Sequence, residues 1–202
     1  MVTSKISPEI WAIVLAAGES SRMNGPKLVL PFGNGTVISS VISGIPDSCI
    51  SGIVVVTGAW EMEVLGAVSG FNVITCRNEF YKSGMLSSVI CGIEKLPENA
   101  DAAIVFQGDQ PGISPLVISE MATAFGRTGK GLILPEYNGK RGHPLLIARS
   151  YFLKVKELDH RTGLRGILTE YSFDIHEVVV KDSYILHDID TMKDYGEYLK
   201  RQ

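Results

Sequence analysis

Three features are scarce in this sequence: cysteine, long apolar runs and clustered positive charge. The cysteines Cys49, Cys76 and Cys91 are odd in number and form no C-x-x-C pair. That pattern argues against a disulfide framework and against a thiolate metal site, so we interpret all three as small packing residues. No apolar run approaches the roughly 20 residues that span a bilayer, and residues 1–8 are too polar for a signal peptide. We therefore expect a cytoplasmic protein with no membrane partner.

The charge balance is close to neutral. Lysine and arginine total 19, aspartate and glutamate total 22, and the net charge is −3. A surface that neutralises nucleic-acid phosphates needs clustered cations, whereas the basic residues here are scattered, so we expect no nucleic-acid partner. At 202 residues, of which 45% are hydrophobic, the chain is long enough to build one full core. We predict a single domain over residues 1–202.

Short β-branched segments alternate with helical patterns in the first half of the chain. Strands are predicted at residues 13–16, 53–56, 71–75 and 102–106, and helices at residues 36–45, 60–68 and 84–96. This alternation implies parallel strands that are joined by right-handed crossovers.

The second half carries a hairpin signal. Asn138-Gly139 lies between apolar segments at residues 129–135 and 144–148, which indicates antiparallel pairing. The other predicted elements are a helix at residues 115–125 capped by Ser114, two short helices capped by Ser150 and Thr162, a strand at residues 177–180, and a final helix to residue 200 with a Thr191–Asp194 capping box. The whole pattern predicts a Rossmann-like three-layer α/β/α fold with a mixed, mostly parallel sheet.

The loop after the first strand has an unusual composition. Small residues at positions 17, 18, 20 and 21 allow several backbone N–H groups to point at one anion, and Arg22 and Lys27 add permanent positive charge. A nucleoside triphosphate needs both features. The loop is neither a dinucleotide fingerprint nor a P-loop, because Pro26 separates Gly25 from Lys27. The alternative interpretation is a Gly/Ser turn that carries surface cations.

Four loops follow predicted parallel strands and should meet at one edge of the sheet, where α/β proteins bind ligands. They are residues 16–27, Thr57-Gly58, Arg77-Asn78 and residues 108–111. Asp109, directly after a buried strand, offers the hard oxygen ligand that Mg²⁺ prefers. A turn aspartate is the alternative interpretation of Asp109.

Residues 15–28 resemble the L-A-A-G-x-S-x-R-M-G-x-P-K-L signature of Mg-dependent nucleotidyltransferases of the MobA-like NTP transferase family, most closely the molybdenum cofactor cytidylyltransferase branch. Asn24 stands where those relatives have glycine, and asparagine tolerates the positive φ of such a turn. Residues 78–88, 108–111 (G-D-Q-P), 142–144 (G-H-P) and 186–191 are similar to further segments of the family.

The resemblance implies a role for each matching residue. Arg22, Lys27 and Asp109 would be catalytic, and Mg²⁺ would be held by Asp109 and Asp190, with Asp188 as the alternative to Asp190; capping of the last helix is the other interpretation of Asp190. The nucleotide would contact Leu15, Ala16, Ala17, Gly18, Ser20, Ser21, Thr57, Gly58, Asn78, Ser87, Ser88 and Gly108.

The acceptor substrate would contact His143 and Arg165, although a structural His143 and a solvated Arg165 are equally simple interpretations. One departure bears on the acceptor. Arg161 stands where the relatives carry an acidic residue, so either Asp159 replaces that residue or the acceptor differs. Met192 replaces a proline of the family at the start of the last helix.

The implied reaction is transfer of CMP from CTP to the phosphate of molybdopterin, with release of pyrophosphate. CTP is expected because the cytidylyl-transferring relatives carry Ala-Ala-Gly, as residues 16–18 do here, whereas guanylyl-transferring relatives carry Ala-Gly-Gly. Two alternatives remain open at this stage. The chain is a nucleotidyltransferase for a sugar or polyol phosphate, or a non-catalytic accessory protein that delivers nucleotide or cofactor to a molybdenum hydroxylase apoenzyme.

Overall fold

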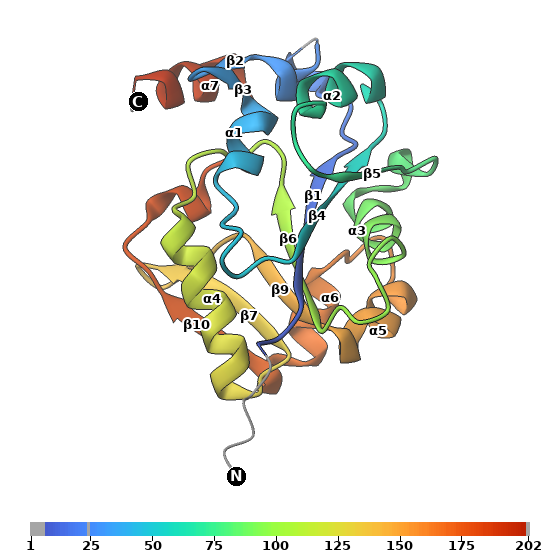
Figure 1. Cartoon of the computed structure of the whole chain (residues 1–202), viewed down its shortest axis with the longest axis vertical. Coiled ribbons are helices and arrows are strands. Elements are labelled where there is room, and N and C mark those ends of the chain that lie inside the picture. The colour runs from blue at the N-terminus through green and yellow to red at the C-terminus, as the bar shows by residue number, and fades with distance from the viewer. Residues whose placement is uncertain (1–6, 24, 201–202) are drawn as a thin grey trace.

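A central twisted sheet lies between two layers of helices (Figure 1). The computed structural model describes residues 7–23 and 25–200. The strands of the sheet are β1 (Ile10–Ala16), β4 (Gly52–Thr57), β5 (Ile74–Arg77), β6 (Ala102–Gln107), β7 (Leu132–Tyr137), β8 (Lys140–Arg141), β9 (Leu145–Ala148) and β10 (Ile175–Val179), and a separate small hairpin is formed by β2 (Pro31–Phe32) and β3 (Gly35–Thr36). The α-helices are α1 (Val37–Ser43), α2 (Glu61–Val68), α3 (Met85–Ile93), α4 (Pro115–Thr128), α5 (Phe152–Glu157), α6 (Arg165–Glu170) and α7 (Met192–Leu199).

The strand order is β10-β7-β9-β6-β1-β4-β5, with β8 paired to β7. Strands β6, β1, β4 and β5 run parallel, as the alternating pattern of the first half predicts. Strand β9 is antiparallel to both β6 and β7, and β10 returns parallel to β7. The sheet is therefore mixed and mostly parallel, which confirms the predicted fold class.

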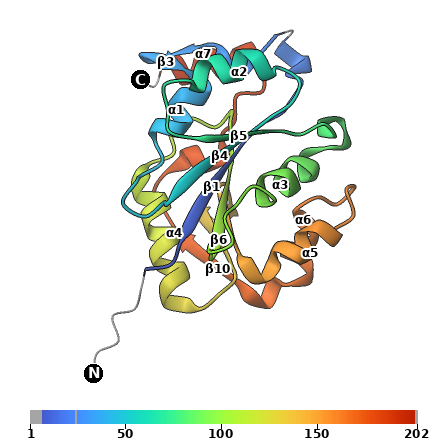
Figure 2. The same cartoon turned by 45° about the vertical axis from the view of Figure 1, so that its right-hand side comes forward.

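Two apolar cores lie on the two faces of the sheet. One contains buried residues of α1, α2, α4 and α7, and the other contains buried residues of α3, α5 and α6. Figure 2 shows α4 and α3 on opposite sides of the central strands. Helix α3 approaches the sheet closely, since a Cβ built on Gly92 would lie 2.5 Å from Ile13 Cγ2. Burial on both faces explains why these strands read as continuous apolar runs.

Several element boundaries differ from the sequence prediction. The third strand lies at Ile74–Arg77 and not at residues 71–75, because Phe71 and Val73 belong to the turn that ends α2. Helix α4 continues to Thr128, where Gly129 adopts a left-handed conformation (φ 70°) and ends it. Asn138 and Gly139 do form a hairpin turn, but it joins β7 to β8, and residues 145–148 form the next strand.

Two of the predicted helix caps are absent and two are present. Helices α5 and α6 begin after Tyr151 and Leu164 without a side-chain cap, so the predictions for Ser150 and Thr162 are wrong. The Thr162 hydroxyl donates instead to the Asp159 carbonyl. The capping box at Thr191 is present, and Ser114 caps α4 as predicted.

The described residues bear on three further sequence predictions. All three cysteines are free thiols, as expected. No helix in the described part of the chain is long and apolar enough to cross a membrane. The predicted turn at Asn24 and residues 1–6 of the polar N-terminal segment lie outside the described residues.

Candidate active site

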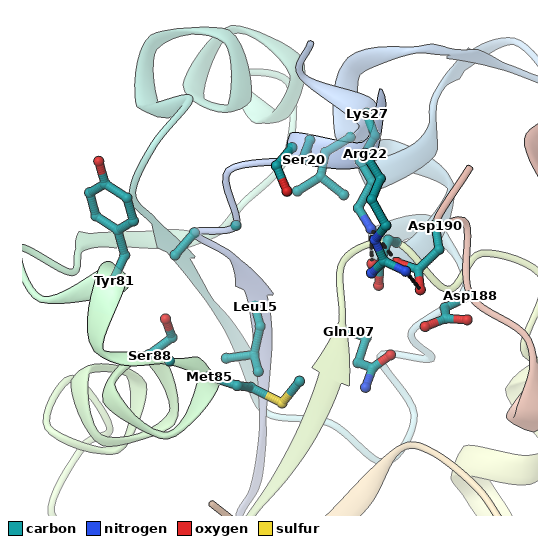
Figure 3. A pocket seen from close by; sticks show the side chains of 16 residues that line it. Leu15, Ser20, Arg22, Lys27, Tyr81, Met85, Ser88, Gln107, Asp188 and Asp190 are labelled. Carbon is teal, nitrogen blue, oxygen red and sulfur yellow. Dashed lines mark hydrogen bonds and ion pairs between the residues drawn. The ribbon is translucent and has the colours of Figure 1, made fainter. Parts of the chain in front are cut away.

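A pocket of about 370 Å³ opens where β1 and β6 end. Side chains from the loop after β1, the start of α3, the end of β6 and the segment before α7 surround it (Figure 3). The lining residues are Leu15, Ala17, Gly18, Ser20, Ser21, Arg22, Lys27, Leu28, Tyr81, Gly84, Met85, Ser88, Gln107, Asp109, Asp188 and Asp190. Two of the four loops predicted to meet here, residues 16–27 and 108–111, contribute lining residues, whereas Thr57-Gly58 and Arg77-Asn78 do not.

The loop after β1 is held in place at several points. The Trp60 indole N–H donates to the Glu19 carbonyl at 3.0 Å, and the Ala59 N–H donates to the Ala17 carbonyl at 3.2 Å. Ser20 has a positive φ of 52°, a conformation that few non-glycine residues adopt. Gly58 packs directly against the loop, because a Cβ there would lie 2.7 Å from the Ala17 carbonyl oxygen. These contacts fix the loop against the start of α2.

Two cations of this loop contact two carboxylates of a cluster of three. One oxygen from each of Asp109, Asp188 and Asp190 lies within 4.8 Å of the others. Lys27 Nζ lies 2.5 Å from Asp109 Oδ2 and 3.2 Å from Asp190 Oδ1, and Arg22 Nη1 lies 2.8 Å from Asp190 Oδ2. The Lys27 side chain is 13% exposed, whereas that of Arg22 is 66% exposed. Lys27 is therefore the inner cation of the site and Arg22 the outer one.

Three carboxylates face only two cations, so the site has an excess of negative charge. Burial and the neighbouring charges of Asp190 and Asp109 raise the pKa of Asp188 above its ordinary value. The Ile189 N–H donates to the Asp109 carbonyl at 2.9 Å, which ties the segment before α7 to the end of β6. A cluster of carboxylate oxygens around an ammonium group has the donor chemistry that suits a hard divalent cation.

Asn78 organises the wall of the pocket and does not line it. Its side chain is 3% exposed, and its amide donates to the hydroxyls of Ser87 (2.8 Å) and Ser88 (3.0 Å). The side-chain carbonyl oxygen of Asn78 accepts a hydrogen bond from the Phe80 N–H at 2.9 Å. Ser88 lines the pocket, while Ser87 lines a neighbouring cavity. Asn78 thus positions the start of α3 beside the pocket.

Other residues that were predicted to contact the nucleotide contact the protein backbone or the core instead. Thr57 is 1% exposed and donates to the Cys76 carbonyl at 3.2 Å. Ala16 is buried in the core, and Gly108 fits closely against the Leu15 carbonyl, where a Cβ would lie at 2.6 Å. None of these residues, and neither Gly58 nor Asn78, is among those that line the pocket. They support the loops whose other residues line it.

The two predicted acceptor residues also lie outside the pocket lining. Arg165 is exposed at the start of α6. His143 is partly buried, and burial lowers the pKa of its imidazole. Asp159 forms an exposed ion pair with Arg161 (2.6 Å), so its carboxylate is already neutralised by the residue that departs from the family pattern.

Sequence reasoning missed several lining residues. Met85 is 52% exposed because it lies in the first turn of α3, beside the pocket, although an apolar residue of a predicted helix is expected in the core. Tyr81 and Gly84 belong to the same segment as the predicted serines. Gln107 is not part of any predicted motif, although a polar residue at the end of the apolar strand A-A-I-V-F indicates a position at the edge of the sheet.

Comparison with known proteins agrees with this geometry. The family model described as MobA-like NTP transferase domain matches residues 12–175. Molybdenum cofactor cytidylyltransferase of Escherichia coli K12 is 29% identical over 187 residues, which cover 92% of this chain and 93% of the relative. Purine catabolism protein PucB of Bacillus subtilis 168 is 26% identical over 200 residues, 94% of this chain and 95% of the relative.

A solved structure has the same fold: Rv0371c of Mycobacterium tuberculosis H37Rv in complex with manganese. Its TM-score is 0.77 at 22% identity, and the match covers 96% of this chain and 100% of that one. The family match spans most of the chain and includes the loop after β1 and the carboxylate at the end of β6. The chain therefore belongs to the MobA-like NTP transferase family and is a nucleotidyltransferase.

Proposed function

We propose that this nucleotidyltransferase transfers CMP from CTP to the phosphate of molybdopterin and releases pyrophosphate. The observation that carries the proposal is the pocket in which a small-residue loop with two cations faces three carboxylates. Similarity to a molybdenum cofactor cytidylyltransferase over nearly the whole chain supports this substrate pair. The Ala-Ala-Gly sequence at residues 16–18, which resembles that of the cytidylyl-transferring relatives, supports CTP.

The nucleotide lies along the loop after β1. Tyr81 and Ser88 lie on one side of the pocket, and the two cations lie on the other side with Asp188 and Asp190 (Figure 3). A base fits the less charged side, and the phosphates reach Arg22 and Lys27. The small side chains allow the backbone N–H groups of the loop to approach the phosphates.

A divalent cation, which we take to be Mg²⁺, fits the three carboxylates. Asp109 and Asp190 would hold it, with Asp188 near enough to contribute. Lys27 Nζ already lies between Asp109 and Asp190, so the site accommodates positive charge at that position. An ion held by these residues would neutralise charge on the reacting phosphates. The manganese complex of a protein with this fold is consistent with a divalent metal.

The protein's own residues act by position and charge. An oxygen of the acceptor phosphate attacks the α-phosphorus of CTP, a new P–O bond forms, and the bond to the pyrophosphate oxygen breaks. Lys27 and Arg22 stabilise the negative charge that grows on the departing pyrophosphate. No side chain is needed as a nucleophile. The other acceptors that sequence analysis left open, sugar and polyol phosphates, would use the same steps.

We further propose that the enzyme works in the cytoplasm and that its product passes to a molybdenum hydroxylase apoenzyme. The second statement follows from the proposed substrate, and the first repeats the expectation from the sequence.

Release of pyrophosphate tests the proposal directly. Purified protein with Mg²⁺ is given CTP, GTP or ATP, each with molybdopterin, a sugar phosphate or a polyol phosphate. We expect release with CTP and molybdopterin, and Asp109→Asn should abolish most of it because a metal ligand is lost. Release with CTP and a sugar phosphate, but not with molybdopterin, would replace the proposed acceptor. The Glu157→Gln variant is a control, because that carboxylate is 68% exposed, pairs with Lys154 and does not line the pocket.

A further inference from the structure

Among the described residues that line the pocket, Gln107 is the one with an amide side chain. It is the last residue of β6 and pairs in register with Leu15 of β1. The five residues before it in the strand are all buried and apolar. Gln107 itself is only partly buried and lines the pocket, so its amide group ends this apolar strand at the site. Figure 3 shows Gln107 below Arg22 and Lys27 and beside Asp188.

One protein group holds this amide. Gln107 Nε2 lies 3.0 Å from His143 Nε2, and in the described part of the chain no other side-chain or backbone partner of the amide is found. The neutral imidazole accepts the amide N–H at Nε2 and carries its own proton on Nδ1. This contact fixes the rotation of the amide about its last bond. The second N–H and the carbonyl oxygen of Gln107 remain for a ligand.

The loop before β9 holds His143 rigidly. The His143 backbone N–H donates to the Ile185 carbonyl at 2.9 Å, and the Gly142 N–H donates to the Pro135 carbonyl at 2.9 Å. Gly142 itself fits so closely that any Cβ there would collide with the Ile185 carbonyl oxygen. His143 therefore presents its ring to Gln107 in a fixed position, although it does not line the pocket itself.

Resting on the proposed transferase activity, we propose that Gln107 contacts the phosphate end of the acceptor and that His143 is a positioning residue that orients the Gln107 amide. In an in-line displacement the acceptor approaches the α-phosphate from the side opposite to the leaving pyrophosphate. Arg22 and Lys27 mark the pyrophosphate side, and Gln107 lies across the carboxylates from them.

The chemistry of an amide suits this position. The acceptor is a phosphomonoester, and its phosphate must lie beside Asp109 and Asp188 before it attacks. An N–H donor from Gln107 orients a phosphate oxygen close to these carboxylates. A lysine or arginine at the same place would hold the attacking oxygen more strongly and would reduce its nucleophilicity. The amide thus selects an anionic acceptor without neutralising it.

Steady-state kinetics with molybdopterin tests the contact. Gln107→Leu, which keeps the size and removes the hydrogen bonds, should raise the KM for molybdopterin about tenfold. The KM for CTP should stay within about twofold, because the nucleotide lies on the other side of the carboxylates. An unchanged KM for molybdopterin, or a rise confined to CTP, overturns the contact while leaving the transferase activity intact.

Variants of His143 test its positioning role. His143→Phe keeps a ring and removes the acceptor, so the KM for molybdopterin should rise about threefold. His143→Gln places an amide oxygen near the Nε2 position and should restore most of the affinity. In the double variant, the KM for molybdopterin should be no higher than in Gln107→Leu alone, because both substitutions remove the same oriented amide. Independent, multiplying effects would show that His143 does not act through Gln107. His176→Phe, on the edge strand β10, is the matched control.

A binding measurement separates this inference from the proposed reaction. The side-chain amide signal of Gln107, identified in ¹⁵N NMR spectra by its absence from Gln107→Leu, should shift with molybdopterin and stay in place with CTP alone. A shift with CTP and none with molybdopterin overturns the contact. If no acceptor is turned over but the signal shifts with glycerol 3-phosphate, the proposed acceptor fails and the phosphomonoester contact stands.

Discussion

Lys27 Nζ lies 2.5 Å from Asp109 Oδ2, so the cation that we assign to the triphosphate contacts a carboxylate that we assign to the metal. The same ammonium group also lies 3.2 Å from Asp190 Oδ1. An ammonium group and a divalent ion cannot both occupy the space between these carboxylates. Metal binding must therefore displace Lys27, and a bound triphosphate offers the displaced ammonium a new partner.

The first prediction concerns this competition. Lys27→Met removes the competing charge, and the affinity for Mn²⁺ without nucleotide should rise about tenfold, a modest effect for one unit charge at contact distance. In the wild-type protein CTP should tighten Mn²⁺ binding far more than in the variant. Electron paramagnetic resonance of free Mn²⁺ measures both quantities. Lys193→Met is the control, because that side chain is 84% exposed and pairs with Glu197. Equal Mn²⁺ affinities for Lys27→Met and wild type would contradict the competition.

The second prediction concerns the thiols. Burial and the neighbouring Cys91 raise the pKa of Cys76 to about 12, and its Sγ lies 3.6 Å from that of Cys91. At pH 8 the thiolate fraction of Cys76 is then only about one in ten thousand, and thiolates are the reactive form. Iodoacetamide at pH 8 should modify Cys49 and Cys91, which are partly exposed, well before Cys76. Mass spectrometry of tryptic peptides follows the reaction, and labelling of Cys76 as early as Cys49 and Cys91 would contradict its raised pKa.

The sequence predicted the fold better than it predicted the pocket lining. The alternating apolar segments determine strand type and order, because burial on both faces demands apolar residues such as those of β1, β4 and β6. Roles inside the site depend on side-chain direction, which spacing does not give. Asn78 and Ser88 belong to one motif, yet Asn78 is buried behind the wall and Ser88 faces the pocket. The contact between Gln107 and His143 joins the end of β6 to the loop before β9, and the two residues are 36 positions apart in the sequence.

The third prediction concerns pH. Burial lowers the pKa of His143 below its ordinary value of 6.5, against the opposing charge of Asp109. Below pH 6.5 the unfolded chain therefore binds a proton at this position before the folded chain does. The free energy of unfolding should fall as the pH decreases from 6.5, and this part of the fall should disappear in His143→Gln. Urea denaturation at pH 7.5 and pH 5.5 measures the difference between the two proteins. An equal decrease in the free energy of unfolding in the wild type and in His143→Gln would exclude His143 as the cause.

The fourth prediction concerns the choice of base. Ala17 lines the pocket and is 5% exposed, with its methyl group close to Gly58. Ala17→Gly removes one methyl group and restores the Ala-Gly-Gly sequence of guanylyl-transferring relatives, so the use of GTP relative to CTP should rise. One methyl group contributes about 1 kcal/mol, which limits the change to roughly tenfold. The ratio of kcat/KM for the two nucleotides measures it. An unchanged ratio would show that other residues select the base.

The fifth prediction separates the two cations of the loop. Lys27 is the inner cation with two carboxylate partners, and Arg22 is 66% exposed with one. Because negative charge grows on the departing pyrophosphate, both cations should bind the transition state better than the ground state. Lys27→Ala should cost on the order of 3 kcal/mol, about a hundredfold in kcat, with a small change in the KM for CTP. Arg22→Ala should cost about tenfold, since solvent screens an exposed charge.

The two variants should also differ in stability. Lys27→Ala leaves Asp109, Asp188 and Asp190 without the inner cation, and repulsion among these carboxylates should lower Tm. Adding Mg²⁺ should restore most of that loss, because the ion takes the place of the ammonium group. Arg22→Ala should leave Tm nearly unchanged. Kinetics at saturating Mg²⁺ and melting curves with and without Mg²⁺ measure both effects. A wild-type kcat in Lys27→Ala would mean that this cation is not used on the triphosphate, and a Tm loss that Mg²⁺ does not reverse would mean that Lys27 serves the fold and not the metal site.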